Sequence, residues 1–110
     1  MSSFVTRYGP IGPYIVTKDE ISDVNNLNMS LDLNGKRMQT GNTKTMIFDV
    51  DMIVSYVSKF MTLCPGDIIT TGTPPGVGMA KKPQLFLKDG DKINLKIDNL
   101  GEQNSKVVTI

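Results

Sequence analysis

The chain has 110 residues, 39% of them apolar and 21% charged, and a net charge of +1. These values are typical of one folded globular domain and exclude an intrinsically disordered chain. The 12 basic and 11 acidic residues form no block of either sign, so no nucleic acid or acidic membrane partner is indicated. We expect a cytoplasmic protein, because the sequence has neither a signal-peptide core nor an apolar run of membrane-spanning length.

Cysteine and histidine narrow the possible chemistry by their scarcity. Cys64 is the single cysteine, and the sequence contains no histidine. This excludes an intrachain disulfide, Ser-His or Cys-His catalysis, and zinc held by imidazole. We interpret Cys64 as a small apolar residue before a turn. Chemistry confined to this chain would therefore depend on carboxylates, lysines or hydroxyls.

The N-terminal third shows short, weakly patterned segments. The prolines of residues 10–13 predict an extended, kinked backbone, and residues 14–17 are a short β-prone run. Residues 18–21 predict one turn of helix or a tight polar turn. An Asn/Asp-rich loop follows over residues 23–28.

A β-hairpin is predicted next. Residues 29–33 alternate apolar and polar side chains, which is typical of a strand with one buried face. Asn34-Gly35 follows, and residues 36–39 can form the returning strand. Asn-Gly between two such runs is a strong hairpin signal, because both turn residues need a positive φ.

One amphipathic helix is predicted, with Asp49 as its N-cap and with Pro65 and Gly66 ending it. Four apolar side chains recur at helical spacing and define its buried face: Ile53, Val57, Phe60 and Met61. No other segment of the chain gives a convincing helix pattern.

The run Thr70–Gly78, called the binding loop below, is the most informative segment. It follows a turn-plus-strand signal over residues 64–69 and contains three glycines and two prolines. Glycines let backbone amides converge on one point, prolines restrict the loop, and threonine hydroxyls donate hydrogen bonds. Such a loop suits a carboxylate or another anionic oxygen. It is not a phosphate-binding P-loop, because no Gly-Lys-Ser/Thr ends it.

The C-terminal segment predicts further strands. Residues 88–91 indicate a turn, residues 92–97 alternate strictly, residues 99–101 turn again, and residues 106–110 can form a terminal strand. The pattern of many short strands around one main helix predicts a single β-rich α+β domain.

Taken together, these segments resemble the C-terminal part of the fumarylacetoacetate hydrolase family. The resemblance covers residues 9–110 and leaves 1–8 unmatched. The motifs that carry it occur in the family's order: Gly9–Thr17, Asn34-Gly35, Gln39–Thr43, Met46–Phe48, Phe60–Leu63, Pro65–Ile69, Thr71–Gly78, Gly90-Asp91 and Leu100-Gly101. Each motif alone is weak, whereas the ordered set is distinctive.

The resemblance implies a mixed β-sheet and β-roll fold with one main helix. It further implies enzymes that hydrolyse, decarboxylate or isomerise small oxo-acids through an enolate on Mg²⁺ or Mn²⁺, often as homodimers. By this comparison Thr73 holds a substrate carboxylate through its hydroxyl and backbone amide. Gly72 lets the ligand approach, and Gln39 faces the substrate region. Two alternatives remain open: a Thr73 hydroxyl that satisfies its own loop, and a Gln39 that simply leaves a hairpin strand.

The chain also departs from the family pattern. Relatives take their metal from a Glu-x-Glu pair and an aspartate that precede the matched part, whereas the glutamates here are Glu20 and Glu102. Ser3 and Thr6 stand where relatives usually carry lysine and aspartate. The resemblance thus implies Mg²⁺ or Mn²⁺ for an intact family enzyme. We expect no catalytic residue and no metal site in this chain alone.

Three functions remain open at this stage. The first is an oxo-acid enzyme in which this chain supplies the carboxylate-binding loop and a companion segment supplies the metal ligands. The second is a catalytically inactive truncated homologue that oligomerises or binds carboxylates weakly. The third is an unrelated small β-rich domain with some other binding role. Because part of a larger fold leaves apolar surface uncovered, self-association is expected.

Overall fold

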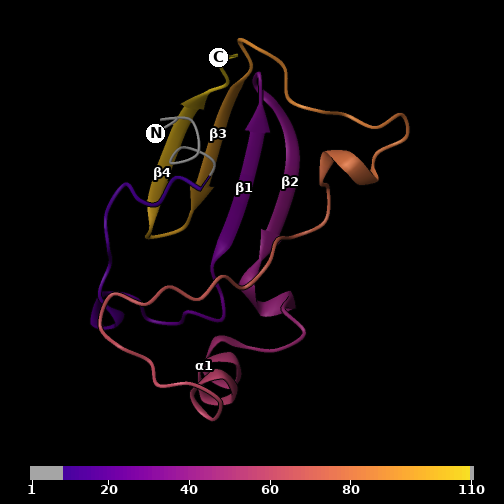
Figure 1. The fold of residues 1–110 in the computed structure, drawn as a ribbon. Coiled ribbons are helices and arrows are strands. Elements are labelled where there is room, and N and C mark those ends of the chain that lie inside the picture. Colours follow the sequence, from indigo (N-terminus) through magenta and orange to yellow (C-terminus); the bar gives the residue numbers. More distant parts are fainter. Residues whose placement is uncertain (1–8, 110) are drawn as a thin grey trace.

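The computed structural model describes residues 9–109. Four strands form one antiparallel sheet in the order β2-β1-β3-β4, and one α-helix lies beyond an end of the sheet (Figure 1). The elements are β1 (Asn28–Leu33), β2 (Lys36–Asn42), α1 (Val50–Ser58), β3 (Lys92–Ile97) and β4 (Gly101–Lys106). Short 3-10 helices cover Lys18–Glu20, Thr43–Thr45 and Gly78–Ala80. The β-rich α+β fold with one main helix is confirmed.

Both hairpins follow from local turn chemistry. Asn34 and Gly35 adopt φ angles of 51° and 79°, which confirms the predicted turn between β1 and β2. Between β3 and β4, Asn99 has a φ of 62° and Gly101 one of 83°. Gly101 already pairs with Ile97, so the chain reverses at once and β4 begins there. The prediction that a terminal strand begins at Lys106 was therefore wrong, because β4 ends there and residues 107–109 form no strand; Ile110 lies outside the described residues.

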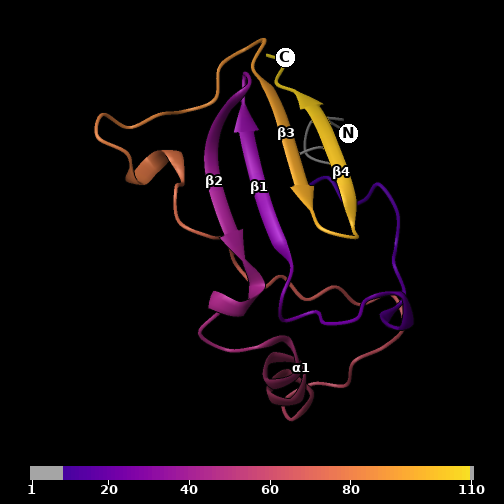
Figure 2. The ribbon, with the colours of Figure 1, turned by 180° about the vertical axis from the view of Figure 1, so that it is seen from behind.

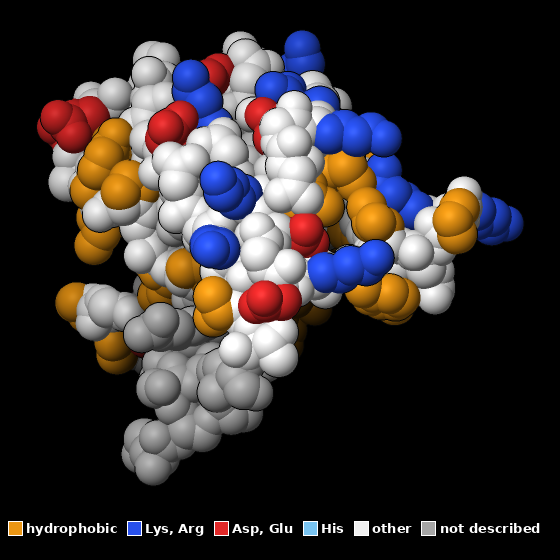
Figure 3. Space-filling view, turned by 90° about the horizontal axis from the view of Figure 1, so that it is seen from above, with side chains coloured by type: hydrophobic (Ala, Val, Ile, Leu, Met, Phe, Trp, Pro, Cys, Tyr) orange, Lys and Arg blue, Asp and Glu red, His pale blue; other side chains and the backbone are white. Residues whose placement is uncertain are grey.

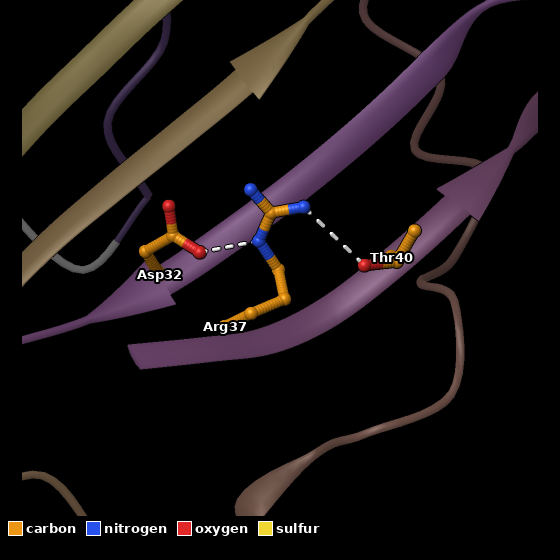
Figure 4. A network of polar contacts seen from close by, with 3 residues as sticks. All are labelled: Asp32, Arg37 and Thr40. Atoms are coloured by element: carbon orange, nitrogen blue, oxygen red, sulfur yellow. Dashed lines mark hydrogen bonds and ion pairs between the residues drawn. The ribbon is translucent and has the colours of Figure 1, made fainter. Parts of the chain in front are cut away.

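The sheet has one apolar and one polar face, as alternation dictates. The apolar face carries Met29, Leu31, Leu33, Ile93, Leu95 and Ile97, all partly exposed. On the polar face, the Arg37 guanidinium pairs with the Asp32 carboxylate and donates to Thr40 Oγ1 at 3.4 Å (Figure 4). This network links the two strands of the first hairpin.

The described residues bury few side chains completely. Among residues 9–109 the buried apolar side chains are Ile21 and Leu27. By contrast, Ile15 and Ile47 are each 92% exposed. Figure 3 shows apolar patches at the surface, between scattered lysine and acidic side chains. The predicted uncovered apolar surface is present in the described residues.

The helix begins as predicted but ends earlier. Asp49 accepts a hydrogen bond from the Met52 amide at 2.7 Å, which confirms the N-cap. The last helical residue is Ser58, so Pro65 and Gly66 do not end the helix. Phe60 is 70% exposed and lies beyond α1, so its predicted place on a buried helical face was wrong.

Two β-prone segments do not form strands. Residues 14–17 and 67–69 run without ladder pairing among the described residues. A strand needs a neighbour for its backbone groups, and the described sheet provides none at these positions. The turn before the second segment is present, since the Asp67 amide donates to the Cys64 carbonyl at 3.0 Å.

Residues 1–8, which include the predicted unmatched segment with Ser3 and Thr6, lie outside the described residues. Within residues 9–109, no helix has the length and hydropathy to cross a membrane.

Candidate carboxylate-binding site

The binding loop lies beside β2, on the side of the sheet away from β4 (Figures 1 and 2). Two glycines permit this close approach. A Cβ added at Gly41 would stand 2.8 Å from Pro74 Cβ, and one added at Gly76 would stand 2.4 Å from the Met38 carbonyl oxygen. Side chains do not tolerate such distances, so glycine at these two positions lets the loop rest on the strand.

Gln39 connects β2 to the loop. Its Nε2 donates to Thr73 Oγ1 at 3.1 Å and to the Pro74 carbonyl at 2.7 Å. Because the Pro74 carbonyl can only accept, the amide must present its NH₂ group to the loop. Gln39 stands opposite Leu31, at a position that the alternation assigns to the apolar face. The structure thus brings Gln39 and Thr73, two of the predicted site residues, into direct contact.

The donors of Thr73 remain available to a ligand. Its hydroxyl oxygen accepts from Gln39, so its proton can be donated outward; the Pro74 carbonyl, at 3.4 Å, is a long alternative acceptor. The Thr73 amide has no hydrogen-bond partner among residues 9–109. Both donors belong to an exposed residue, so a ligand can reach them from solvent.

Gly72, the third predicted site residue, adopts a φ of 90°, which a side chain would strain. A Cβ added there would meet no heavy atom within 4 Å, so this side of the loop is open. A hydroxyl, an amide and an unobstructed glycine together suit one carboxylate. No acid or base is needed for such binding.

The described residues do not bring together the ligands of a metal centre. Residues 9–109 contain no group of three or more His, Cys, Asp or Glu side chains that could hold a metal ion. Hydrogen bonds from the Asn34 side chain and the Lys88 backbone lower the pKa of Asp91, but Asp91 lies at the turn before β3, in a different part of the chain from the binding loop. Surface hollows occur near Lys92 and near Lys82, and neither is lined by the three predicted site residues.

Comparison with known proteins identifies the family. Residues 3–108 match the family model described as the fumarylacetoacetate (FAA) hydrolase C-terminal domain. The chain belongs to the fumarylacetoacetate hydrolase family. A 2,4-didehydro-3-deoxy-L-rhamnonate hydrolase of Sphingomonas sp. is 58% identical over 99 residues, which are 89% of this chain and 35% of that protein. The chain thus spans about a third of this relative's length.

Two solved structures share the fold. The fumarylacetoacetate hydrolase of the psychrophile Exiguobacterium antarcticum superposes with a TM-score of 0.88 at 42% identity, over 92% of this chain and 36% of that one. A maleylpyruvate hydrolase from Sphingobium sp., solved with manganese(II) ion and pyruvate, gives a TM-score of 0.81 at 41% identity, over 90% of this chain and 35% of that one. The predicted membership of the family is confirmed.

Proposed function

We propose that this chain supplies the carboxylate-binding loop of a metal-dependent enzyme that acts on small oxo-acids. The observation that carries the proposal is the contact between Gln39 and Thr73, which fixes a hydroxyl donor at the edge of an open loop. Family membership supports the oxo-acid class, and one relative was solved with the oxo-acid pyruvate.

Each residue has a defined part in this proposal. Gln39 holds Thr73 Oγ1 as an acceptor, so the hydroxyl proton turns to the ligand. The Thr73 amide donates to the second carboxylate oxygen, and Gly72 leaves room for it. Hydrogen bonds to a charged carboxylate are stronger than neutral ones, so two such bonds can orient a small oxo-acid.

The metal ligands must come from elsewhere, because residues 9–109 do not hold a suitable set. We propose that a companion segment provides them, in a longer polypeptide or on another chain. The proposal is supported by the share of the relatives that this chain spans and by its exposed apolar side chains. The companion would cover apolar surface while it brings a Mg²⁺ or Mn²⁺ site to the loop, and the ion would stabilise charge that develops on the substrate oxygen.

A second candidate function is an inactive homologue that oligomerises or binds carboxylates only weakly. It is favoured by the same lack of a metal-ligand set among the described residues. Oligomerisation would cover exposed apolar side chains such as Ile15 and Phe60. In this case the binding loop would keep its conformation but would not contribute to any catalysed reaction.

Calorimetric titration with oxalate, a planar mimic of an enolate, tests the loop. We expect the wild-type chain to bind and Thr73→Val to bind about 10-fold more weakly, since one hydrogen bond to a charged group is lost. Thr70→Val, in the same loop, is the matched control and should bind as the wild type does. Equal binding by all three proteins would exclude Thr73 as the carboxylate ligand.

The same titration, repeated with Mg²⁺ and with a companion segment present, separates the two candidates. If this chain binds oxalate independently of Mg²⁺, the result fits both candidates: an enzyme part that lacks its companion segment, and an inactive homologue. Addition of a companion, namely the part of the Exiguobacterium enzyme outside the matched region, then decides between them. Mg²⁺-dependent binding by the mixture supports the enzyme. Binding that the companion leaves unchanged supports the inactive homologue.

A further inference from the structure

The turn between β1 and β2 contains two residues that can react with each other. Of the asparagines in the sequence, only Asn34 is followed by a glycine, Gly35. Asparagine is thermolabile, because the next backbone nitrogen can attack the carbonyl carbon of its side chain. Glycine hinders this attack least, since it has no side chain. Both residues are exposed, so water and base can reach the turn.

The attacking group, the backbone amide of Gly35, is unhindered. It donates no hydrogen bond to another group in the part of the chain that the structure describes. A Cβ added at Gly35 would meet no heavy atom within 4 Å, so nothing packs against this side of the turn. The proton of this amide is therefore accessible to base, and the nitrogen is free to act as a nucleophile.

The group under attack, the side-chain amide of Asn34, is instead held by the start of β3. Its Nδ2 donates to the Asp91 carboxylate at 2.9 Å, and its Oδ1 accepts from the Lys92 amide at 2.9 Å. Figures 1 and 2 show the hairpin turn beside the start of β3. Both polar atoms of the side chain are thus bound to another segment, which restrains its rotation toward Gly35.

Asp91 is itself firmly placed. Its Oδ2 accepts from the Lys88 amide at 2.8 Å, and its carbonyl accepts from the Val107 amide at 2.8 Å. The hydrogen bond from Asn34 lowers the pKa of Asp91, so the carboxylate is ionised at neutral pH. A charged acceptor forms a stronger hydrogen bond than a neutral one. Asp91 is therefore a strong restraint on the Asn34 side chain.

We propose that Asn34 is a site of self-modification by deamidation and that Asp91 controls its rate. Once the side chain leaves Asp91, base removes the proton of the Gly35 amide, and the nitrogen attacks Asn34 Cγ. A bond from this nitrogen to Cγ closes a succinimide ring, while the Cγ–Nδ2 bond breaks and ammonia leaves. Water then opens the ring at either carbonyl, which leaves aspartate or isoaspartate in place of Asn34. Water is the only co-reactant, and nothing is oxidised or reduced.

The product no longer fits its surroundings. Its carboxylate has no donor for Asp91, so two like charges face each other where a hydrogen bond stood. Directly before the turn, Leu33 pairs with Ile93, so the repulsion loosens this end of the pairing between β1 and β3. The inference does not depend on carboxylate binding by the binding loop, and either proposal can fail while the other stands.

Peptide mapping by mass spectrometry at neutral pH tests the control by Asp91, since an amide and an acid differ in mass. We expect Asp91→Ala to deamidate at Asn34 about 10-fold faster than the wild type, because a hydrogen bond to a charged group is lost. Asp89→Ala is the matched control in the same turn. The Asp89 carboxylate accepts from the Thr109 amide and makes no contact with Asn34, so this variant should react as the wild type does.

A second control separates local release from general loss of stability. Asp49→Ala removes the cap of α1, so it should destabilise the chain without accelerating the reaction of Asn34. The wild type in urea, where no native restraint remains, should react at least as fast as Asp91→Ala. Equal rates for wild type and Asp91→Ala, equal acceleration by Asp49→Ala, or no reaction of Asn34 in urea would each overturn the proposal.

Exchange of the two side chains tests the consequence. Asn34→Asp has the same carboxylate as one product and should unfold at a lower urea concentration than the wild type, because it faces Asp91. Adding Asp91→Asn to this variant places an amide donor opposite a carboxylate again, and its oxygen can still accept from the Lys88 amide. The double variant should therefore recover much of the lost stability. A double variant no more stable than Asn34→Asp would show that this contact does not restrain the turn, which contradicts the proposal.

Discussion

Gly76→Ala is expected to detach the binding loop from β2. The new Cβ would stand 2.4 Å from the Met38 carbonyl oxygen, and a backbone atom cannot rotate away as a side chain can. Gly76 also has a φ of 109°, which costs a residue with a side chain about 1–3 kcal/mol. If the loop lifts away, Gln39 loses two hydrogen bonds, each contributing about 0.5–1.5 kcal/mol. The expected destabilisation is therefore about 2–6 kcal/mol.

Urea unfolding followed by circular dichroism measures this cost, and NMR of the Gln39 side-chain amide reports the contact with Thr73 directly. Gly66→Ala is the matched control, because Gly66 also has a positive φ, 96°, but its added Cβ meets nothing within 4 Å. It should lose about 1–3 kcal/mol and keep the Gln39 signal. If Gly76→Ala costs no more than Gly66→Ala and leaves that signal unchanged, the loop does not rest on β2 as described.

Two further predictions concern the ends of other elements. Asp49→Ala removes the acceptor of the Met52 amide and should cost about 1 kcal/mol in urea unfolding, whereas Asp49→Ser should restore most of it. The pKa of Asp91 is lowered by its hydrogen bond from Asn34, so its carboxylate stabilises the fold at neutral pH, and this contribution is lost as the pH falls through the lowered pKa. The stability gap between wild type and Asp91→Asn should thus close in acid; a gap that stays constant with pH would contradict the prediction.

The elements that depend on local chemistry were predictable from the sequence. The Asn34-Gly35 turn and the Asp49 cap each need a specific residue at a specific position, and both are confirmed. The alternating run that became β3 also formed as predicted. These features depend on a few neighbouring residues, so contacts with distant parts of the chain did not change the conformation that the local sequence favours.

The features that depend on distant partners were not predictable in the same way. Residues 14–17 and 67–69 are β-prone, yet a strand forms only where another strand accepts its hydrogen bonds. The helix ends at Ser58 although apolar residues continue at helical spacing through Met61. The periodicity shows which residues could share a face, but not whether anything packs against that face.

The candidate site was partly visible in the sequence. The family resemblance implies roles for Thr73 and Gln39, whereas the hydrogen bond between them is seen only in the structure. The position of Gln39 in the strand pattern also indicated a special role, because it is a polar residue on the apolar face of its strand. The contacts of Gly41 and Gly76 could not be read from the sequence, because they depend on the path of the loop over β2.

An NMR titration of the wild-type chain with oxalate tests the central claim most directly. We expect the largest chemical-shift changes at the Thr73 and Gly72 amides and at the side-chain amide of Gln39, with smaller changes elsewhere. Shifts centred instead on the lysine-lined hollow around Lys81 and Lys82, or no shifts at millimolar oxalate, would contradict the assignment of the binding loop as a carboxylate site.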